Sequence, residues 1–297
     1  MGNITVSELK ALCDFGLHEA LVKDTLTDAL QAPLTRIRFL GRYASWNGFF
    51  GSGVASLAGK IGRSRGLFND ATQPVAALAD RSVFVASFFF DAARDEFDDR
   101  DTVHRDTHRC LAQSMLKGVI DVETAANPLQ HADLNALLHE PEWLTLLNAR
   151  VAEGYGVGTA DDLPAIFSCI GYHLGSELLA DREFSIIDET LCFYAPTLVQ
   201  TLKNTRVNIA GQDHVAYQWL AIHSGHGGGA EADHFDWATQ GARLAFRNVP
   251  TAMHDVLRAQ LHQGFKRFAE DHRTFFERVN HDPLMNLTEI GAKHGEC

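Results

Sequence analysis

The sequence predicts an all-α protein, a single-domain helical bundle of about seven to nine helices. Apolar residues recur at spacings of three and four, as in Leu9, Leu12, Cys13 and Leu17, while strand-like alternation is hard to find. No connector is long enough to separate two domains, so residues 1–297 are expected to form one unit. The 19 Phe and an apolar fraction of 45% can fill one large core.

The first half of the chain contains three helical stretches joined by short connectors. Ser7 is a plausible N-cap for the first stretch, and Pro33 follows its end. The second stretch is rich in small residues. The third is expected to break where Asp and Arg residues crowd together. In order, the stretches are residues 6–30, 35–58 and 74–118, with a polar connector at 62–73 and the break near 97–101.

The second half continues the helical pattern. A glycine-rich loop at 154–158 precedes a helix capped by Thr159 or Asp161, which carries His173 and Glu177. The final helix opens at Pro250, with Val256, Leu257, Leu261, Phe265, Phe268 and Phe276 expected on its inner side. The other predicted helices cover residues 132–153, 188–206, 212–223 and 231–246.

Charge and cysteine content exclude several classes of protein. A formal net charge of -12 argues against general binding to nucleic acid or to anionic membranes. The five cysteines are scattered and odd in number, which is typical of reduced thiols rather than a disulfide framework. No secretory signal and no apolar run of transmembrane length are visible. We therefore expect a cytoplasmic protein.

Three stretches place carboxylates and histidines on shared helix faces, because residues three, four or seven apart point the same way. Such sets hold pairs of metal ions in helical bundles. Any one pair could simply be a solvated face, but three in one chain favour a metal site. The stretches contain Asp101, His104 and His108; His173 and Glu177; and His223, His226, Glu231 and His234.

Two of these stretches carry specific expectations. Glu177 lies in an otherwise apolar helix, where an uncompensated carboxylate would cost several kcal/mol. A metal ion or a salt-bridge partner would offset that cost, whereas Asp181 and Glu183 are expected to be solvated. The glycines at 227–229 interrupt the third stretch, which is compatible either with a helix end and loop or with ligands converging from both sides.

The order of these helices resembles the haem-oxygenase-like di-iron oxidases and oxygenases. The last motif of that superfamily is a His, three residues, an Asp, two residues and a His. Its second half is matched by Glu231-Ala-Asp-His234 with Glu in place of Asp, but Gly227 stands where the first His is usual. The upstream motif is matched by Asp101 and His108, with Asp where Glu is usual. The resemblance spans roughly residues 80 to 245.

The resemblance implies a metal site and an activity. Its metal ligands would be Glu177 and His234, together with Asp101 or His104, with His108 and Glu231, and with one of His223 and His226; Glu177 and Glu231 would also be the catalytic residues. It would hold Fe(II), as two ions, and use O2 as co-substrate, because carboxylate and imidazole ligands favour iron. The favoured reaction is N-oxygenation of a small amine or amino-heterocycle in natural-product biosynthesis, as in nitroimidazole-forming enzymes. An external electron donor would be required.

Other functions remain open at this stage. A di-iron oxidase of the same fold could instead carry out oxidative C–C cleavage or desaturation. A haem-binding protein or haem oxygenase would use His18 in the first helix as its iron ligand. A non-catalytic helical binding protein, and a cofactor-free hydrolase or oxidase of the thiaminase or quinone-synthesis type, are further alternatives. The substrate, the reductant and the oligomeric state, monomer or homodimer, are not specified by the sequence.

Overall fold

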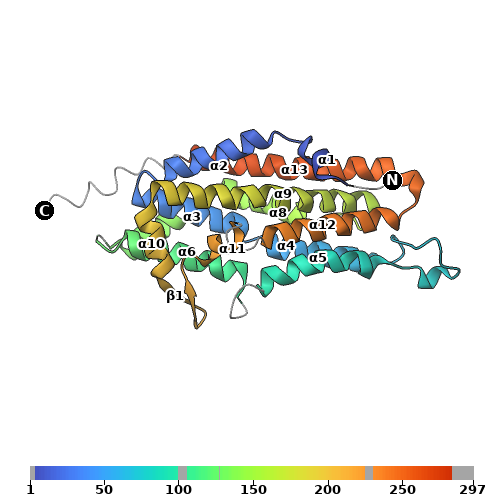
Figure 1. Ribbon diagram of the computed structural model, residues 1–297, viewed down its shortest axis with the longest axis horizontal. Helices are drawn as coiled ribbons and strands as arrows, with labels where there is room; N and C mark the ends of the chain where they lie inside the picture. Colours follow the sequence, from blue (N-terminus) through green and yellow to red (C-terminus); the bar gives the residue numbers. More distant parts are fainter. Residues whose placement is uncertain (1–3, 100–105, 127, 225–229, 283–297) are drawn as a thin grey trace.

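The bundle is organised around α9 (Leu163–Tyr194), a helix of 32 residues that runs through its middle in a computed structural model of the protein (Figure 1). The structure describes residues 4–99, 106–126, 128–224 and 230–282. The helices before α9 are α1 (Val6–Lys10), α2 (Phe15–Ala29), α3 (Pro33–Asn47), α4 (Phe50–Arg63), α5 (Ser82–Phe97), α6 (His108–Glu123), α7 (His131–Leu138) and α8 (Glu142–Gly154), with a 3-10 turn at Ala76–Leu78. Those after it are α10 (Pro196–Asn204), α11 (Gln218–His223), α12 (Ala230–Arg247) and α13 (His254–Asn280), with a 3-10 turn at Thr251–Met253.

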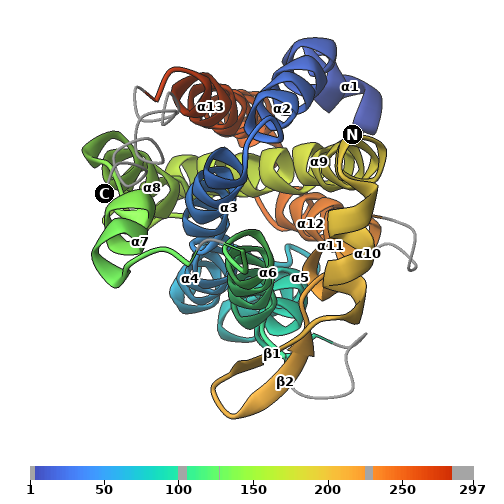
Figure 2. The same ribbon diagram turned by 90° about the vertical axis from the view of Figure 1, so that its left-hand side faces the viewer.

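Neighbouring helices surround α9 on several sides. Figures 1 and 2 show α2 and α13 along one side of it, with α4, α5 and α12 along another, and contacts of α9 with α2, α4, α12 and α13 agree with this arrangement. Phenylalanines from many elements fill the space between the helices, and Phe39, Phe89, Phe167 and Phe265 are fully buried. The predicted all-α fold is therefore confirmed.

The closest helix packing is between α9 and α13. A Cβ atom on Gly171 would lie 1.8 Å from the carbonyl oxygen of Leu261, and one on Gly264 would lie 1.8 Å from that of Ser168. Because each glycine faces a carbonyl of the other helix, the two backbones can approach only where side chains are missing. Most of the predicted inner face of α13 is buried, but Val256 is 57% exposed and belongs to the outside.

Several predicted helices are divided in the structure. The first stretch splits into α1, capped by Thr5, and α2, capped by Asp14, so Ser7 is not the N-cap. The stretch 35–58 becomes α3 and α4, and 132–153 becomes α7 and α8 where Pro141 intervenes. The break after Phe97 is present as predicted. These divisions make the helices more numerous than expected.

The ends of α9 also differ from expectation. Its N-cap is Asp162, whose carboxylate accepts from the backbone N–H of Ala165, rather than Thr159 or Asp161. It continues to Tyr194, into the region expected to begin the next helix. Glu183, expected to be solvated, is 5% exposed.

A β-hairpin replaces the first part of the helix expected over 212–223. Strands β1 (Arg206–Ile209) and β2 (Gln212–Val215) pair antiparallel, and Ala210 and Gly211 make the turn with φ of 53° and 86°. Positive φ at both turn residues matches the right-handed twist of the strands. The hairpin packs on α6, where Gly118 leaves room for Ala216. None of the described helices combines the length and apolar character needed to cross a bilayer.

Candidate functional site

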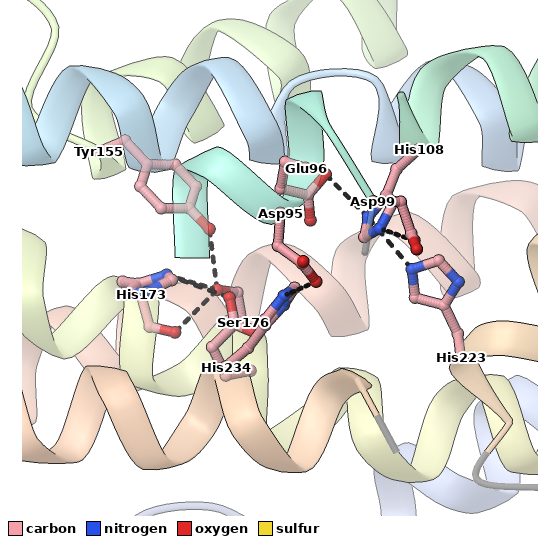
Figure 3. Close-up of polar contacts among 10 residues, drawn as sticks. Asp95, Glu96, Asp99, His108, Tyr155, His173, Ser176, His223 and His234 are labelled. Carbon is pink, nitrogen blue, oxygen red and sulfur yellow. Dashed lines mark hydrogen bonds and ion pairs between the residues drawn. The ribbon is translucent and has the colours of Figure 1, made fainter. Parts of the chain in front are cut away.

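Histidines and carboxylates from five helices converge in the interior beside α9 (Figure 3). The set lies where α5 ends, α6 begins and α11 ends, so residues distant in sequence meet at helix termini and at the middle of α9. Its members are Asp95 and Glu96 of α5, Asp99 after it, His108 of α6, His173 and Glu177 of α9, His223 of α11 and His234 of α12. We call this set the His–carboxylate cluster.

One half of the cluster is centred on His108. Its Nδ1 lies 3.1 Å from Glu96 Oε2 and 3.2 Å from His223 Nε2, and its Nε2 lies 2.8 Å from Asp99 Oδ2. The Nδ1 of His223 lies 2.6 Å from the carbonyl oxygen of Trp219, to which it must donate. This bond fixes the tautomer of His223 and leaves its Nε2 lone pair directed toward His108.

The other half joins α5, α9 and α12. His234 Nε2 lies 3.0 Å from Asp95 Oδ2, and His234 Nδ1 lies 3.6 Å from Glu177 Oε2. The second carboxylate oxygen of Glu177 lies 3.2 Å from His173 Nδ1. Glu177 therefore bridges two imidazoles. These contacts supply the partners that a buried carboxylate requires. The halves meet where the rings of His108 and His234 lie 6.1 Å apart.

Burial and neighbouring charges set the protonation states in the half of the cluster centred on His108. Burial alone would lower the pKa of His108, but the charge of Glu96 and the hydrogen bonds with Asp99 and Glu96 raise it to about 10. Burial alone would raise the pKa of Glu96, yet the charge and hydrogen bond of His108 lower it to about 2. Burial, with repulsion from His108, lowers the pKa of His223 to about 3. In the metal-free protein His108 is thus a cation and His223 is neutral.

A cavity of about 250 Å³ opens beside the cluster. One part of its wall is formed by Glu96, His108, Glu177 and His223, and aromatic rings that include Phe184 and Trp219 form another part. A small organic molecule in this cavity would touch both acidic and imidazole groups.

Four of the predicted site residues come together in the structure, namely His108, Glu177, His223 and His234. Glu231 belongs to α12, but its side chain is not among those described. Asp101, His104 and His226 lie outside the described residues. His173, paired with Glu177 in the sequence, contacts it through Nδ1.

Three carboxylates of the cluster were not predicted. Asp95 and Glu96 immediately precede the segment 97–101, and Asp99 lies within it, but the sequence predicts only a helix break there. A usable signal in the sequence is the spacing of Ala92 and Glu96, which are four apart and therefore place this acid on the same helix face as an apolar residue. Asp95 and Asp99 are 4% and 3% exposed, which a purely solvated break would not produce.

The described residues contain no group of three or more His, Cys, Asp or Glu side chains arranged to hold a metal ion. Their donor atoms are directed at one another in pairs, as the distances above show. The donors are nevertheless all nitrogen and oxygen, the ligand types that suit iron, manganese and zinc.

Comparison with known proteins identifies the fold. No protein-family model and no curated protein sequence matches the chain. Among solved structures, the chain is similar to the crystal structure of a TenA homologue from Pseudomonas syringae pv. tomato, with a TM-score of 0.54 and 13% identity over 93% of this chain and 92% of that one. The chain therefore has the helical TenA and haem-oxygenase-like fold, and this part of the resemblance is confirmed. At such low identity, the similarity extends to the fold alone.

Proposed function

We propose that the protein is a non-haem di-iron oxygenase that uses O2 to N-oxygenate a small amine or amino-heterocycle. The observation that carries this proposal is the convergence of His108, Glu177, His223 and His234, predicted from separate stretches, beside a cavity of substrate size. Four imidazoles and four carboxylates lie in one largely buried region, whereas such side chains are seldom buried in a core that serves packing alone.

The hydrogen bonds of the cluster support metal binding in two ways. Histidines that bind metals usually donate their second ring N–H to a carboxylate or backbone carbonyl. His223 donates its Nδ1–H to the carbonyl of Trp219, and His234 Nε2 is held by Asp95, so Nε2 of the former and Nδ1 of the latter would be the ligand atoms. In addition, the buried Nε2 of His173 has no hydrogen-bond partner in the described part of the chain.

The residues proposed to hold the two ions combine the described cluster with positions outside it. His108, Glu177, His223 and His234 would be joined by Glu96, by Glu231 and by one or more of Asp101, His104 and His226. When bound, ferrous iron supplies the electrons that begin the reduction of O2, so repeated turnover requires an external electron donor. Glu177 holds His173 and His234 in fixed orientations, and Trp237, whose ring lies 5.5 Å from that of His234, helps to exclude water.

The haem alternative does not fit the surroundings of His18. This residue is 5% exposed, and its Nδ1 lies 3.0 Å from His272 Nδ1. The cavity beside it has a volume of about 10 Å³, which is room for about one water molecule rather than a porphyrin. For the cofactor-free hydrolase alternative, a cysteine nucleophile in the cavity beside the cluster is not available among the described residues, because none of the described cysteines lines it.

The test is metal content together with O2 uptake. Protein reconstituted anaerobically with Fe(II) is expected to bind about two ions per chain and to consume O2 when an amine and a reductant are added. His234→Gln and Glu231→Gln should abolish O2 uptake with the fold intact, because each removes a ligand while it keeps most of the side-chain volume. His131→Ala, an exposed position on α7, is the matched control.

Mass spectrometry of the product distinguishes the reactions. A hydroxylamine, nitroso or nitro product supports N-oxygenation, whereas an alkene or a shortened chain would assign the same site to desaturation or C–C cleavage. Oxidation that continues undiminished in the presence of a chelator would refute the di-iron proposal as a whole.

A further inference from the structure

The cavity beside the cluster is lined by a positively charged side chain as well as by carboxylates. Arg109 is the only arginine or lysine among its described lining residues, and it follows directly after His108 at the start of α6. Glu96 and Glu177 line the same cavity. A ligand there therefore meets both a guanidinium group and carboxylates.

Local contacts hold the Arg109 guanidinium in place without neutralising it. Its Nη1 donates to the carbonyl oxygen of Ala44. The same group lies against Gly48, where a Cβ atom would come within 2.8 Å of Nη1. Within the described ranges no carboxylate lies at ion-pair distance from Arg109, although Glu96 lines the same cavity. Four of its five N–H donors are thus left for water or a ligand.

The start of α6 adds to this preference for an anion. The helix has 16 residues, and its N-cap Thr107 lines the cavity together with Arg109. The N-terminal end of a helix of this length carries partial positive charge that stabilises a nearby anion. The rest of the wall includes apolar and aromatic side chains, among them Phe50, Phe184 and Trp219.

We propose that the substrate is an amino acid with an apolar body, whose carboxylate binds Arg109 while its amine faces the His–carboxylate cluster. Guanidinium and carboxylate form two parallel hydrogen bonds, which fixes orientation as well as affinity. Glu96 and Glu177 line the same cavity and repel a carboxylate placed beside them, so the reverse orientation is disfavoured. This inference rests on the proposed function only for what happens to the amine; recognition of the carboxylate is a property of the cavity.

The test compares acids with their uncharged amides. The probes are L-leucine, L-phenylalanine and 6-aminohexanoate, each paired with its carboxamide, titrated calorimetrically into metal-free protein and into anaerobic protein loaded with Fe(II). At least one acid should bind roughly tenfold or more tightly than its amide, because hydrogen bonds to charged groups contribute at this level. Quenching of tryptophan fluorescence that is lost in Trp219→Phe provides a second binding signal from the cavity wall.

Variants of Arg109 decide whether this residue is responsible. Arg109→Gln should remove the preference for the acid and leave binding of the amide within about twofold, since only the charged contact is lost. Arg109→Lys keeps the charge but not the paired hydrogen bonds, so it should retain part of the preference. Arg94→Gln, an exposed arginine of α5 outside the cavity, is the matched control. Circular dichroism and melting temperature verify that each variant is folded.

The results separate this inference from the proposed function. A preference for acids that depends on Arg109, found in a protein that takes up no iron, would support the inference and refute the oxygenase. Three results would overturn the inference: the amides bind as tightly as the acids, the preference survives in Arg109→Gln, or no acid binds. This holds even if the iron-loaded protein consumes O2 with a simple amine.

Discussion

At the scale of single residues, a second buried polar network joins α2, α3, α9 and α13. His18 Nδ1 lies 3.0 Å from His272 Nδ1, and His272 Nε2 lies 2.6 Å from Glu183 Oε2. The hydroxyl of Tyr43 donates to the other oxygen of Glu183. Each member thus has a partner, which is the condition for burying such groups without a large cost.

The pKa of His18 makes part of the stability dependent on pH. Burial, together with the charges of His272 and Arg273, lowers it from 6.5 to about 4, against the opposing charges of Asp14 and Glu270. The unfolded chain binds a proton on His18 below pH 6.5, whereas the folded protein does so only below about pH 4. Stability is therefore full above pH 6.5 and is lost as the pH falls toward 4.

We expect His18 to account for a loss of about 2 kcal/mol in the free energy of unfolding between pH 7 and pH 5. His18→Gln keeps a polar side chain that does not titrate, so its unfolding free energy should decline less over the same range. Guanidinium unfolding at the two pH values measures the difference. Identical declines in wild type and variant would show that His18 is not the titrating group.

At the scale of elements, the contact of α9 with α13 sets the positions of His173 and Glu177. Gly171 lies only two residues before His173, and a Cβ on it would overlap the backbone of Leu261. Backbone at such a contact cannot move aside as a flexible side chain can. Gly171 and Gly264 therefore fix how α9 and α13 are aligned along their axes. This alignment also sets where His173 and Glu177 lie along the bundle.

Gly171→Ala and Gly264→Ala are each expected to destabilise the fold by at least about 2 kcal/mol, because the helices must separate to admit the methyl group. Gly59→Ala in α4 is the control. Its Cβ would have no neighbour closer than 4.0 Å, so it should stabilise by up to about 1 kcal/mol through higher helix propensity. Thermal and chemical unfolding test both. Gly171→Ala with unchanged stability would contradict the close contact.

Some elements of the fold were predicted from the sequence and others were not. The helix with His173 and Glu177 was predicted because a long apolar run with two polar residues four apart is typical of a buried helix that carries both polar groups on one face. The hairpin was missed because β1 and β2 have four residues each, too few for alternation to stand out, and packing on α6 selects the strand form. The pairings of Asp95 with His234 and of Glu96 with His108 were missed because they join helices that are distant in the sequence.

At the scale of the whole molecule, the His–carboxylate cluster joins five helices that are otherwise held by apolar packing. Any ion bound there would link α5, α6, α9, α11 and α12, so its binding would stabilise the folded chain as a unit. It stays a prediction that residues 1–297 form one domain, and so does the possible homodimer.

We expect saturating Fe(II) to raise the free energy of unfolding by about 2.7 kcal/mol at a concentration 100 times the dissociation constant. Anaerobic differential scanning fluorimetry with and without Fe(II) measures the corresponding rise in melting temperature. Asp95→Asn should reduce the rise, because Asp95 orients His234 without needing to bind the metal itself. His131→Ala should leave the rise unchanged. A rise that is equally large in Asp95→Asn would exclude this role.

The bond between His18 and His272 spans 254 positions of the chain, and this has a consequence for biosynthesis. On a translating ribosome α2 is complete long before α13 exists, since protein synthesis adds about 5–20 residues per second. The face of α2 that α13 will cover therefore waits roughly 10 to 45 seconds for its partner. During that interval the nascent chain exposes His18 and Thr25, which contact His272 and Phe276 in the finished fold, to chaperones and to neighbouring chains.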